Sequence, residues 1–259
     1  MISGAEAHRI GGALESVAGW TREVIVVLNE EVGDGTEEIA VRHGARVFRE
    51  PWKGHVAQKN SAARKASQPW RLGLDADEVV SPALRTEIEE TFARPERLDQ
   101  HAAFGFPRLT RYCGRWIRHG DWYPDRSVRL WKRDAAEWGG VDPHDKLLVR
   151  GRVGRLHGDL LHYNAENIDR QVAKITSFGN DFVRHMQAVG RDARWLDLAI
   201  RPWWRFFRGY VLRLGFLDGW QGYHIAWMTA FHTINRYAKL REAANAGRPE
   251  TGDRTRPRS

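Results

Sequence analysis

The residues best suited to chemistry lie in one short segment, Leu72-Gly73-Leu74-Asp75-Ala76-Asp77-Glu78. A short apolar run ends there in two aspartates, Asp75 and Asp77, that are two positions apart. Apolar residues followed by a turn are typical of a buried strand in an α/β sheet, and ligands of such sheets bind beyond the carboxyl ends of the strands. Carboxylates at that place can hold a hard divalent cation, which in turn can bind a diphosphate. The segment therefore predicts a Mg²⁺ or Mn²⁺ site for a ligand that contains a diphosphate.

The same segment has a simpler interpretation. An aspartate after a strand often caps a turn or the next helix, and acidic residues on loops are usually solvated. The seven residues by themselves leave both interpretations open.

The first part of the chain alternates strand-like and helix-like stretches, which indicates a βα architecture. Predicted strands cover residues 23–29, 45–48 and 70–75, and the last of these delivers the two aspartates. Predicted helices cover residues 9–17, 36–43 (closed by Gly44) and 56–66. Ser81 and Pro82 predict the N-cap and the first residue of a further helix. Residues 1–3 are barely half a strand, so either the true start lies upstream or the first strand is very short.

The middle of the chain indicates strands and loops, with strand candidates at 104–110, 126–132 and 153–163. Asn164 is expected to cap a long helix over residues 165–189. From Arg194 onward the pattern is helical and dense in aromatic residues. Residues 243–259 are polar with Gly and Pro, which predicts a disordered tail.

Composition limits the classes of protein that fit. A chain of 259 residues can form one sizeable α/β domain with an appendage. The single cysteine, Cys113, excludes an intramolecular disulfide framework and suits a reducing cytoplasm. The first residues contain no basic segment followed by an apolar one, so no signal peptide is expected.

The net charge of +8 is unevenly distributed. From Arg201 onward, eleven Arg or Lys face four Asp or Glu, a net charge of +7, so the first 200 residues are nearly neutral. A basic, aromatic-rich segment suggests an anionic partner, either a membrane or a nucleic acid.

Several short motifs occur in a fixed order along the chain. They are Ala13-Leu14-Glu15-Ser16-Val17, Asp34-Gly35-Thr36-Glu37-Glu38-Ile39-Ala40, Gln58-Lys59-Asn60, Leu74-Asp75-Ala76-Asp77-Glu78, and Trp122-Tyr123-Pro124-Asp125 followed by Arg129-Leu130. Together they resemble the family 2 glycosyltransferases, and most closely the bacterial subgroup of lipopolysaccharide core glucosyltransferases. The resemblance extends from Ile2 to about Arg241.

The resemblance implies an α/β, nucleotide-diphospho-sugar transferase (GT-A-like) fold with a Rossmann-type sheet and a C-terminal helical, aromatic-rich appendage. We accordingly expect a catalytic domain over residues 1–163, a helical membrane-associating region over 164–242, and a tail over 243–259. The family pattern also implies the site residues. Donor binding is expected from Asn29, Asp34, Lys59, Asn60 and Asp75, and metal binding from Asp77.

Two carboxylates are candidates for the general base that takes the proton of the acceptor hydroxyl, and sequence alone does not decide between them. Asp145 occupies the acidic position of the family's acceptor-side loop, and Asp125 follows aromatics that could line the acceptor pocket. Further acceptor-side candidates are Trp122, Tyr123, Arg129 and His144. Arg129 could hold a phosphate or pair with an acidic site residue.

The chain departs from the family pattern in three places. Gly4-Ala5-Glu6-Ala7 stands where the first strand usually ends in Asn-Glu-Glu, and Asn29 replaces the usual nucleotide-binding Asp. Pro143-His144-Asp145 replaces Val-His-Glu, which retains a carboxylate on a shorter side chain.

The aromatic, basic region does not fit a membrane-spanning helix, which needs about 20 mostly apolar residues. Between Arg205 and Arg236 it is interrupted by Arg208, Arg213 and Asp218. Mixed Trp, Tyr and Arg along helices fit a segment that lies in the membrane interface, although some of these aromatics should pack as core.

The leading hypothesis is an inverting glycosyltransferase that uses a nucleoside diphosphate hexose, with UDP-glucose as the expected donor, and a divalent metal. Its expected acceptor is a glycolipid or polysaccharide in lipopolysaccharide core biosynthesis, at the cytoplasmic face of the inner membrane, and nucleic acid is not expected as a partner. A sugar nucleotidyltransferase is the alternative enzyme, but Gly11-Gly12 lacks the basic loop that such enzymes carry. A non-catalytic membrane-binding or nucleic-acid-binding module is the third hypothesis.

Overall fold

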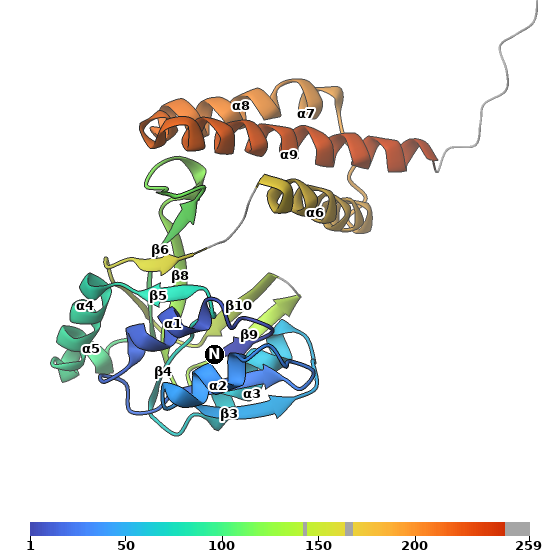
Figure 1. Ribbon diagram of the computed structural model, residues 1–259. Coiled ribbons are helices and arrows are strands. Elements are labelled where there is room, and N and C mark those ends of the chain that lie inside the picture. The colour runs from blue at the N-terminus through green and yellow to red at the C-terminus, as the bar shows by residue number, and fades with distance from the viewer. Residues whose placement is uncertain (142–143, 164–167, 247–259) are drawn as a thin grey trace, which may run out of the picture. The chain divides into compact units, whose positions relative to one another are not determined.

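The computed structural model describes residues 1–141, 144–163 and 168–246 (Figure 1). The chain forms two compact units. The first unit comprises Met1–Arg111 and Tyr123–Asn164, and the second, which we call the helical unit, comprises Tyr112–Trp122 and the residues from Ala165 onward. Residues 112–122 group with the helical unit, and the division into domains at residue 163 stays a prediction.

A small parallel sheet opens the first unit. It consists, in spatial order, of β1 (Ile2–Ser3), β2 (Ile25–Asn29) and β3 (Arg46–Glu50). The apolar run of β2 is buried from Ile25 to Leu28, which explains why this β-branched segment forms the central strand. The carboxyl ends of these parallel strands lie at one edge of the sheet.

A larger mixed sheet follows the path β4-β8-β6-β12-β5, and β11 also pairs with β6. Besides β7, which is described with the helical unit below, its strands are β4 (Trp70–Leu72), β5 (Glu78–Val80), β6 (Ala103–Tyr112), β8 (Asp125–Lys132), β11 (Val153–Arg155) and β12 (Leu160–His162). The inward residues Phe104, Phe106, Leu130 and Leu160 form its apolar core. The middle strands predicted from the sequence are therefore confirmed, with 153–163 divided into two.

An antiparallel hairpin, β9 (Ala136–Val141) and β10 (His144–Val149), was not predicted. It places Asp145 opposite Gly140, close to the turn of the hairpin. The segment 136–141 contains Gly139 and Gly140, which weaken a strand signal, so the pattern alone indicated a loop.

Five helical segments of the first unit cover its sheets among the described residues: α1 (Ile10–Val17), α2 (Thr36–Arg42), α3 (His55–Lys65), α4 (Pro82–Phe92) and α5 (Pro95–Asp99). Helix α4 begins as predicted, because the Ser81 side chain accepts a hydrogen bond from the backbone N of Leu84 (3.1 Å) and Pro82 is its first residue. Helix α3 contacts β1, β2 and β9, so it connects the small sheet to the hairpin.

The helical unit contains β7 (Arg115–Trp116), η1 (Gly120–Trp122), α6 (Ile168–Ala188), α7 (Trp195–Ala199), α8 (Arg201–Phe207), a π-helical turn η2 (Arg208–Leu212), η3 (Gly215–Asp218) and α9 (Gly219–Ala246). Helix α9 packs against α6 and α8. It extends to Ala246, past residue 243, where the sequence predicts the tail to begin. None of the helices in the described part of the chain has the length and apolarity needed to cross a bilayer.

The α/β class predicted from the sequence is confirmed, and so is the C-terminal helical, aromatic-rich appendage. Strand β4 ends at Leu72, three residues earlier than expected. Asp75 and Asp77 therefore lie on the loop that joins β4 to β5.

Candidate active site

The loop between β4 and β5 presents its two aspartates because its other residues are anchored in the core. Leu74 and Ala76 are buried, so the side chains between and after them are turned toward the cleft. Gly73 lies against two indole rings, and a Cβ at this position would meet atoms of Trp131 and Trp138 at 3.1 Å. Packing on one side of the loop thus fixes the position of the acids on the other.

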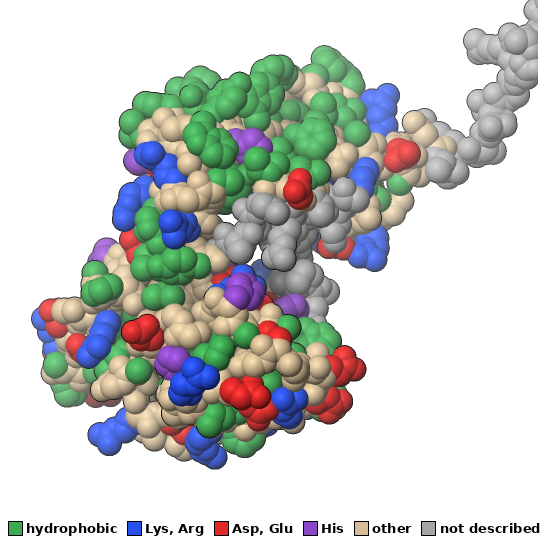
Figure 2. Space-filling view, viewed as in Figure 1, with side chains coloured by type: hydrophobic (Ala, Val, Ile, Leu, Met, Phe, Trp, Pro, Cys, Tyr) green, Lys and Arg blue, Asp and Glu red, His purple; other side chains and the backbone are tan. Residues whose placement is uncertain are grey.

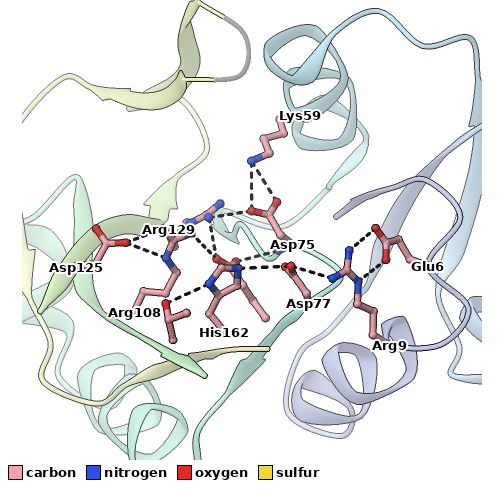
Figure 3. Close-up of polar contacts among 11 residues, drawn as sticks. Glu6, Arg9, Lys59, Asp75, Asp77, Arg108, Asp125, Arg129 and His162 are labelled. Atoms are coloured by element: carbon pink, nitrogen blue, oxygen red, sulfur yellow. Dashed lines mark hydrogen bonds and ion pairs between the residues drawn. The ribbon is translucent and has the colours of Figure 1, made fainter. Parts of the chain in front are cut away.

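Asp75 lies between two cations (Figure 3). Its carboxylate is 3.1 Å from Lys59 Nζ on α3 and 2.9 Å from Arg129 Nη2 on β8. Both cations are nearly enclosed, and both also lie over the ring of Trp138, at 4.6 and 5.5 Å from its centroid. Asp75 therefore joins α3 to the large sheet.

The alternation of charge continues in both directions from Asp75. Lys59 also contacts Asp145 Oδ2 at 2.9 Å, and Arg129 also contacts Glu78 Oε1 at 2.9 Å. On the far side of Glu78, Arg108 is 3.5 Å from Glu78 and 2.6 Å from Asp125. We call the series Asp145–Lys59–Asp75–Arg129–Glu78–Arg108–Asp125 the charge ladder.

The ladder shifts the pKa values of Asp75 and Arg129. Burial by itself would raise the pKa of Asp75, but Arg129 and Lys59 lower it well below its ordinary value. Burial would lower the pKa of Arg129, but Glu78 and Asp75 raise it. These residues consequently remain ionised and paired at neutral pH.

Asp77 belongs to a second cluster. Its Oδ2 is 3.4 Å from Nε2 of His162 and 3.4 Å from Arg9, which also pairs with Glu6. Nδ1 of His162 lies 3.3 Å from the Thr110 hydroxyl, which fixes the orientation of the ring (Figure 3). Burial opposes ionisation of Asp77, but His162 and Arg9 lower its pKa overall.

Both clusters open into one cleft of about 780 Å³ in the first unit. Its walls include Arg9, Lys59, Asp75, Asp77, Arg108, Arg129, Asp145 and His162. A second cavity of about 460 Å³ shares Lys59, Asp75 and Arg129, but its other walls are mostly apolar, with Trp20, Trp70 and Phe92 among them. The larger cleft is the one suited to a charged ligand.

The donor atoms around Asp77 fit a divalent cation that shares its coordination with a ligand. Among the described residues, no three His, Cys, Asp or Glu side chains are grouped closely enough to form a complete protein site. Asp77 and His162, however, bring one oxygen and one nitrogen donor within 3.4 Å of each other. A cation of the Mg²⁺ type is commonly bound by one or two protein ligands, with substrate phosphates and water completing its shell.

Asn60, expected to face the nucleotide, uses both ends of its amide for the protein backbone. Nδ2 donates to the carbonyl oxygen of Trp138 (2.8 Å), and Oδ1 accepts from its backbone N (2.9 Å). This paired contact attaches α3 to β9, and it orients Lys59 on the same helix.

Asp34 and Asn29 lie at the carboxyl edge of the small sheet. Asp34 accepts hydrogen bonds from the Thr36 hydroxyl and from the backbone N of Ala7, and these bonds lower its pKa. It thus ties the start of α2 to the loop after β1. Asn29 is the half-buried last residue of β2. The described residues that line the cleft do not include either of them.

The acceptor-side candidates are dispersed. Asp145 and Arg129 line the cleft, whereas Asp125 pairs with Arg108 and is not among the described lining residues. The Tyr123 hydroxyl donates to Asp159 (2.9 Å), and Trp122, in the helical unit, packs edge-on against Tyr112. The side chain of His144 lies outside the described residues.

His162 and Arg108 were missed by the sequence reasoning. His162 ends a predicted strand, but only the pairing of β12 with β5 places it opposite Glu78. Arg108 is likewise placed by the pairing of β6 with β8, where it lies opposite Asp125. A polar residue at the end of an apolar strand was the one local signal for His162.

Arg129→Gln should destabilise the protein by about 3–5 kcal/mol, because it leaves the enclosed Glu78 carboxylate short of its main partner. Denaturation by urea, followed by circular dichroism, measures the free energy of unfolding. Adding Glu78→Gln should recover part of the loss, and Arg85→Gln, which breaks an exposed pair with Glu89, should have little effect. A loss no larger in Arg129→Gln than in Arg85→Gln would contradict the ladder.

The stabilisation from Asp77 should depend on acid pH. Its pKa is lower in the folded protein than in the unfolded chain, where it is about 3.9. Its contribution is therefore fully present above that value and is lost as pH falls through the folded pKa. The difference in unfolding free energy between the wild type and Asp77→Asn should be constant from pH 7 to about pH 5 and shrink below about pH 4. A constant difference down to pH 3 would contradict the assignment.

Comparison with known proteins identifies relatives of this chain. The sequence model for glycosyl transferase family 2 matches residues 3–147. An uncharacterized glycosyltransferase, RT0209 of Rickettsia typhi, is 31% identical over 251 residues, covering 93% of this chain and 85% of the relative. The lipopolysaccharide core biosynthesis glycosyltransferase LpsC of Rhizobium meliloti is 26% identical over 233 residues, covering 83% of each chain.

Among solved structures, S. aureus TarS 1-349 matches with a TM-score of 0.45 and 13% identity, covering 97% of this chain and 92% of that one. The mannosyltransferase PcManGT of Pyrobaculum calidifontis, in complex with GDP-Man and Mn²⁺, matches with a TM-score of 0.46 and 15% identity, covering 96% and 74%. The sequence relationships confirm the resemblance and the predicted enzyme class: the chain belongs to glycosyltransferase family 2.

Proposed function

We propose that this glycosyltransferase inverts the anomeric centre of a hexose as it moves it from a nucleoside diphosphate sugar to a glycolipid or polysaccharide acceptor. The donor expected from the resemblance is UDP-glucose. The observation that carries the proposal is the single cleft onto which Asp75, Asp77, Arg129 and Asp145 converge.

The size and charge of the cleft support a donor of this kind. Its volume of about 780 Å³ lies within the usual range for sites that enclose small ligands. Arg129 Nη1 and Nε are buried without a hydrogen-bond partner within the described part of the chain. These two atoms are enclosed, so it is the positive charge of Arg129, a residue that lines the cleft, that is suited to phosphate oxygens. Lys59 supplies a further positive charge beside Asp75.

Asp77 and His162 are the residues that would hold Mg²⁺ or Mn²⁺. When bound, the cation would act as a Lewis acid that stabilises the negative charge of the departing diphosphate. Arg9, which also lines the cleft, contacts the same oxygen of Asp77 as His162 and offsets part of its negative charge. Thr110 keeps the His162 ring in the orientation that presents Nε2 to Asp77.

Asp145 is proposed as the general base. In an inverting displacement the acceptor oxygen attacks the anomeric carbon, and the bond from that carbon to the diphosphate oxygen breaks. The diphosphate leaves with the bonding electron pair, and the hydroxyl proton goes to the Asp145 carboxylate. Asp145 lines the cleft and is held by Lys59 at 2.9 Å, which orients its carboxylate. Asp125, held by Arg108, is the alternative base.

The acceptor and the location of the enzyme are proposed from its relative and its surface. LpsC is named for lipopolysaccharide core biosynthesis, and the chain aligns with most of it. We propose an acceptor of the same kind, a cell-envelope glycolipid, and work at the cytoplasmic face of the inner membrane as a peripheral protein. No nucleic acid is needed for this function.

UDP-glucose should raise the melting temperature of the wild type in the presence of Mn²⁺ and much less in its absence. A ligand at about 100 times its dissociation constant adds about 2.7 kcal/mol of stability. Asp77→Asn should lose the Mn²⁺-dependent part of the shift together with glycosyl transfer, whereas the exposed control Asp99→Asn should keep both. A panel of UDP-, GDP- and dTDP-sugars identifies the nucleobase of the donor. Full transfer activity in Asp77→Asn would refute the metal role.

Asp145→Asn should lower kcat by about 10²–10⁴-fold, the usual contribution of a general base, and leave the donor-induced thermal shift largely intact. Asp125→Asn should lower kcat far less. The measurement is the rate of UDP release at saturating donor with a solubilised core glycolipid as acceptor. If the larger loss occurs in Asp125→Asn, that residue is the base.

A further inference from the structure

The helical unit exposes large apolar side chains that a protein normally buries. On α8 the exposed residues include Trp203, Trp204 and Phe207, and Trp203 is 63% exposed. They are spaced by one to four positions and so occupy one sector of the helix. Exposed apolar patches of this kind mark interaction sites.

Helix α9 extends the same surface. Its exposed residues follow each other at intervals of three or four positions: Trp220, Tyr223, Trp227, Phe231 and Ile234. Its buried residues, such as Ile225, Tyr237 and Leu240, face the interior of the unit instead. The exposed residues of α8 and α9 form two stripes that join, because the ring centroid of Trp227 lies 5.6 Å from that of Trp203 and 4.7 Å from that of Phe206.

Apolar side chains gather over α7, α8 and α9 in Figure 2. We call the joined stripes on α8 and α9 the aromatic face. Its residues are exposed although α9 already packs on α6 and α8, so this surface is left over after the core of the unit has formed.

A cluster of arginines lies next to the aromatic face along the sequence of α8 and η2. The Asp121 carboxylate, only 8% exposed, is contacted by Arg208 at 2.8 Å and by Arg205 and Arg213 at 3.2 Å each. Three cations on one anion leave an excess of two positive charges. Burial and the neighbouring arginines lower the pKa of Arg205, as expected where like charges are crowded. The cluster can therefore accept further anions.

The order Trp203-Trp204-Arg205-Phe206-Phe207-Arg208 alternates aromatic and cationic residues over α8 and the first residue of η2. Such a helix can lie in the plane of a membrane interface, with rings at the acyl boundary and guanidinium groups at the phosphates. A second copy of the chain is a poorer partner, because a symmetric contact would bring two arginine clusters of the same sign together.

We propose that the aromatic face docks on the surface of an anionic bilayer, and that Arg205, Arg208 and Arg213, held in place by Asp121, bind lipid phosphates. The inference rests on the proposed function in one respect: a glycolipid acceptor explains why the enzyme would bind a membrane. The surface itself is inferred from the helical unit.

Sedimentation of the full chain with vesicles tests the proposal. The wild type should bind vesicles that contain phosphatidylglycerol at low salt, bind more weakly as salt increases, and bind phosphatidylcholine vesicles least. Absence of binding to the anionic vesicles at low salt would overturn the inference.

Variants separate the two parts of the surface. The triple variant Arg205→Gln, Arg208→Gln, Arg213→Gln should bind anionic vesicles about 100-fold more weakly. Arg213→Gln alone leaves Asp121 two partners, so it should fold normally and lose about 5-fold. Trp203→Gln with Trp204→Gln and Phe231→Gln should weaken binding to both kinds of vesicle by about 10-fold or more.

The matched controls are in the first unit. A triple variant with Arg42, Arg85 and Arg152 changed to Gln controls for the arginine variant, and the exposed Val41→Gln controls for the aromatic one. They should bind like the wild type, and an equal loss in controls and variants would overturn the proposal. A dimer in solution that the Trp203 variant dissociates would also overturn it, in favour of a second copy. The donor-induced thermal shift is measured in parallel, so a failure of vesicle binding and a failure of nucleotide-sugar binding are seen separately.

Discussion

The site depends on one requirement, that each charge removed from water has an opposite charge beside it. Asp75 meets this requirement with Lys59 on one side and Arg129 on the other, and Glu78 meets it with Arg129 and Arg108. Unpaired, any of these groups would carry a desolvation penalty of several kcal/mol. The charge ladder therefore determines where α3, β8 and the loop after β4 come together.

Such a ladder also prepares the cleft for a charged ligand. An anionic ligand that entered the cleft would meet guanidinium and ammonium groups whose positions are already fixed by carboxylates, so little ordering would remain to be done on binding. The Asp77 cluster is different in kind, because its distances of 3.4 Å are longer than the 3.1 and 2.9 Å that join Asp75 to Lys59 and Arg129. The charge ladder supports the site, and the Asp77 cluster leaves room for a ligand to replace its present contacts.

Local signals made much of the fold predictable. The apolar run of β2 and the Ser81–Pro82 start of α4 depend on neighbouring residues only, and both are observed. Long-range pairing was not predictable from one sequence. The hairpin of β9 and β10 is obscured by Gly139 and Gly140, and His162 joins the site only because β12 pairs with β5. Motif position pointed to the loop of Asp75 and Asp77, whose aspartates line the cleft, but it could not show that the Asn60 amide is used by the backbone of Trp138.

The paired contact between the Asn60 amide and the backbone of Trp138 attaches α3 firmly to the β9–β10 hairpin. Lys59 sits on the helix and Asp145 on the hairpin, so the group expected beside the diphosphate and the group expected beside the acceptor keep their spacing during any local opening. The hairpin is consequently not an interchangeable module. Grafting it from a relative without the matching helix would separate an amide from its backbone partner and a carboxylate from its lysine, so the helix and the hairpin must be inherited as a pair.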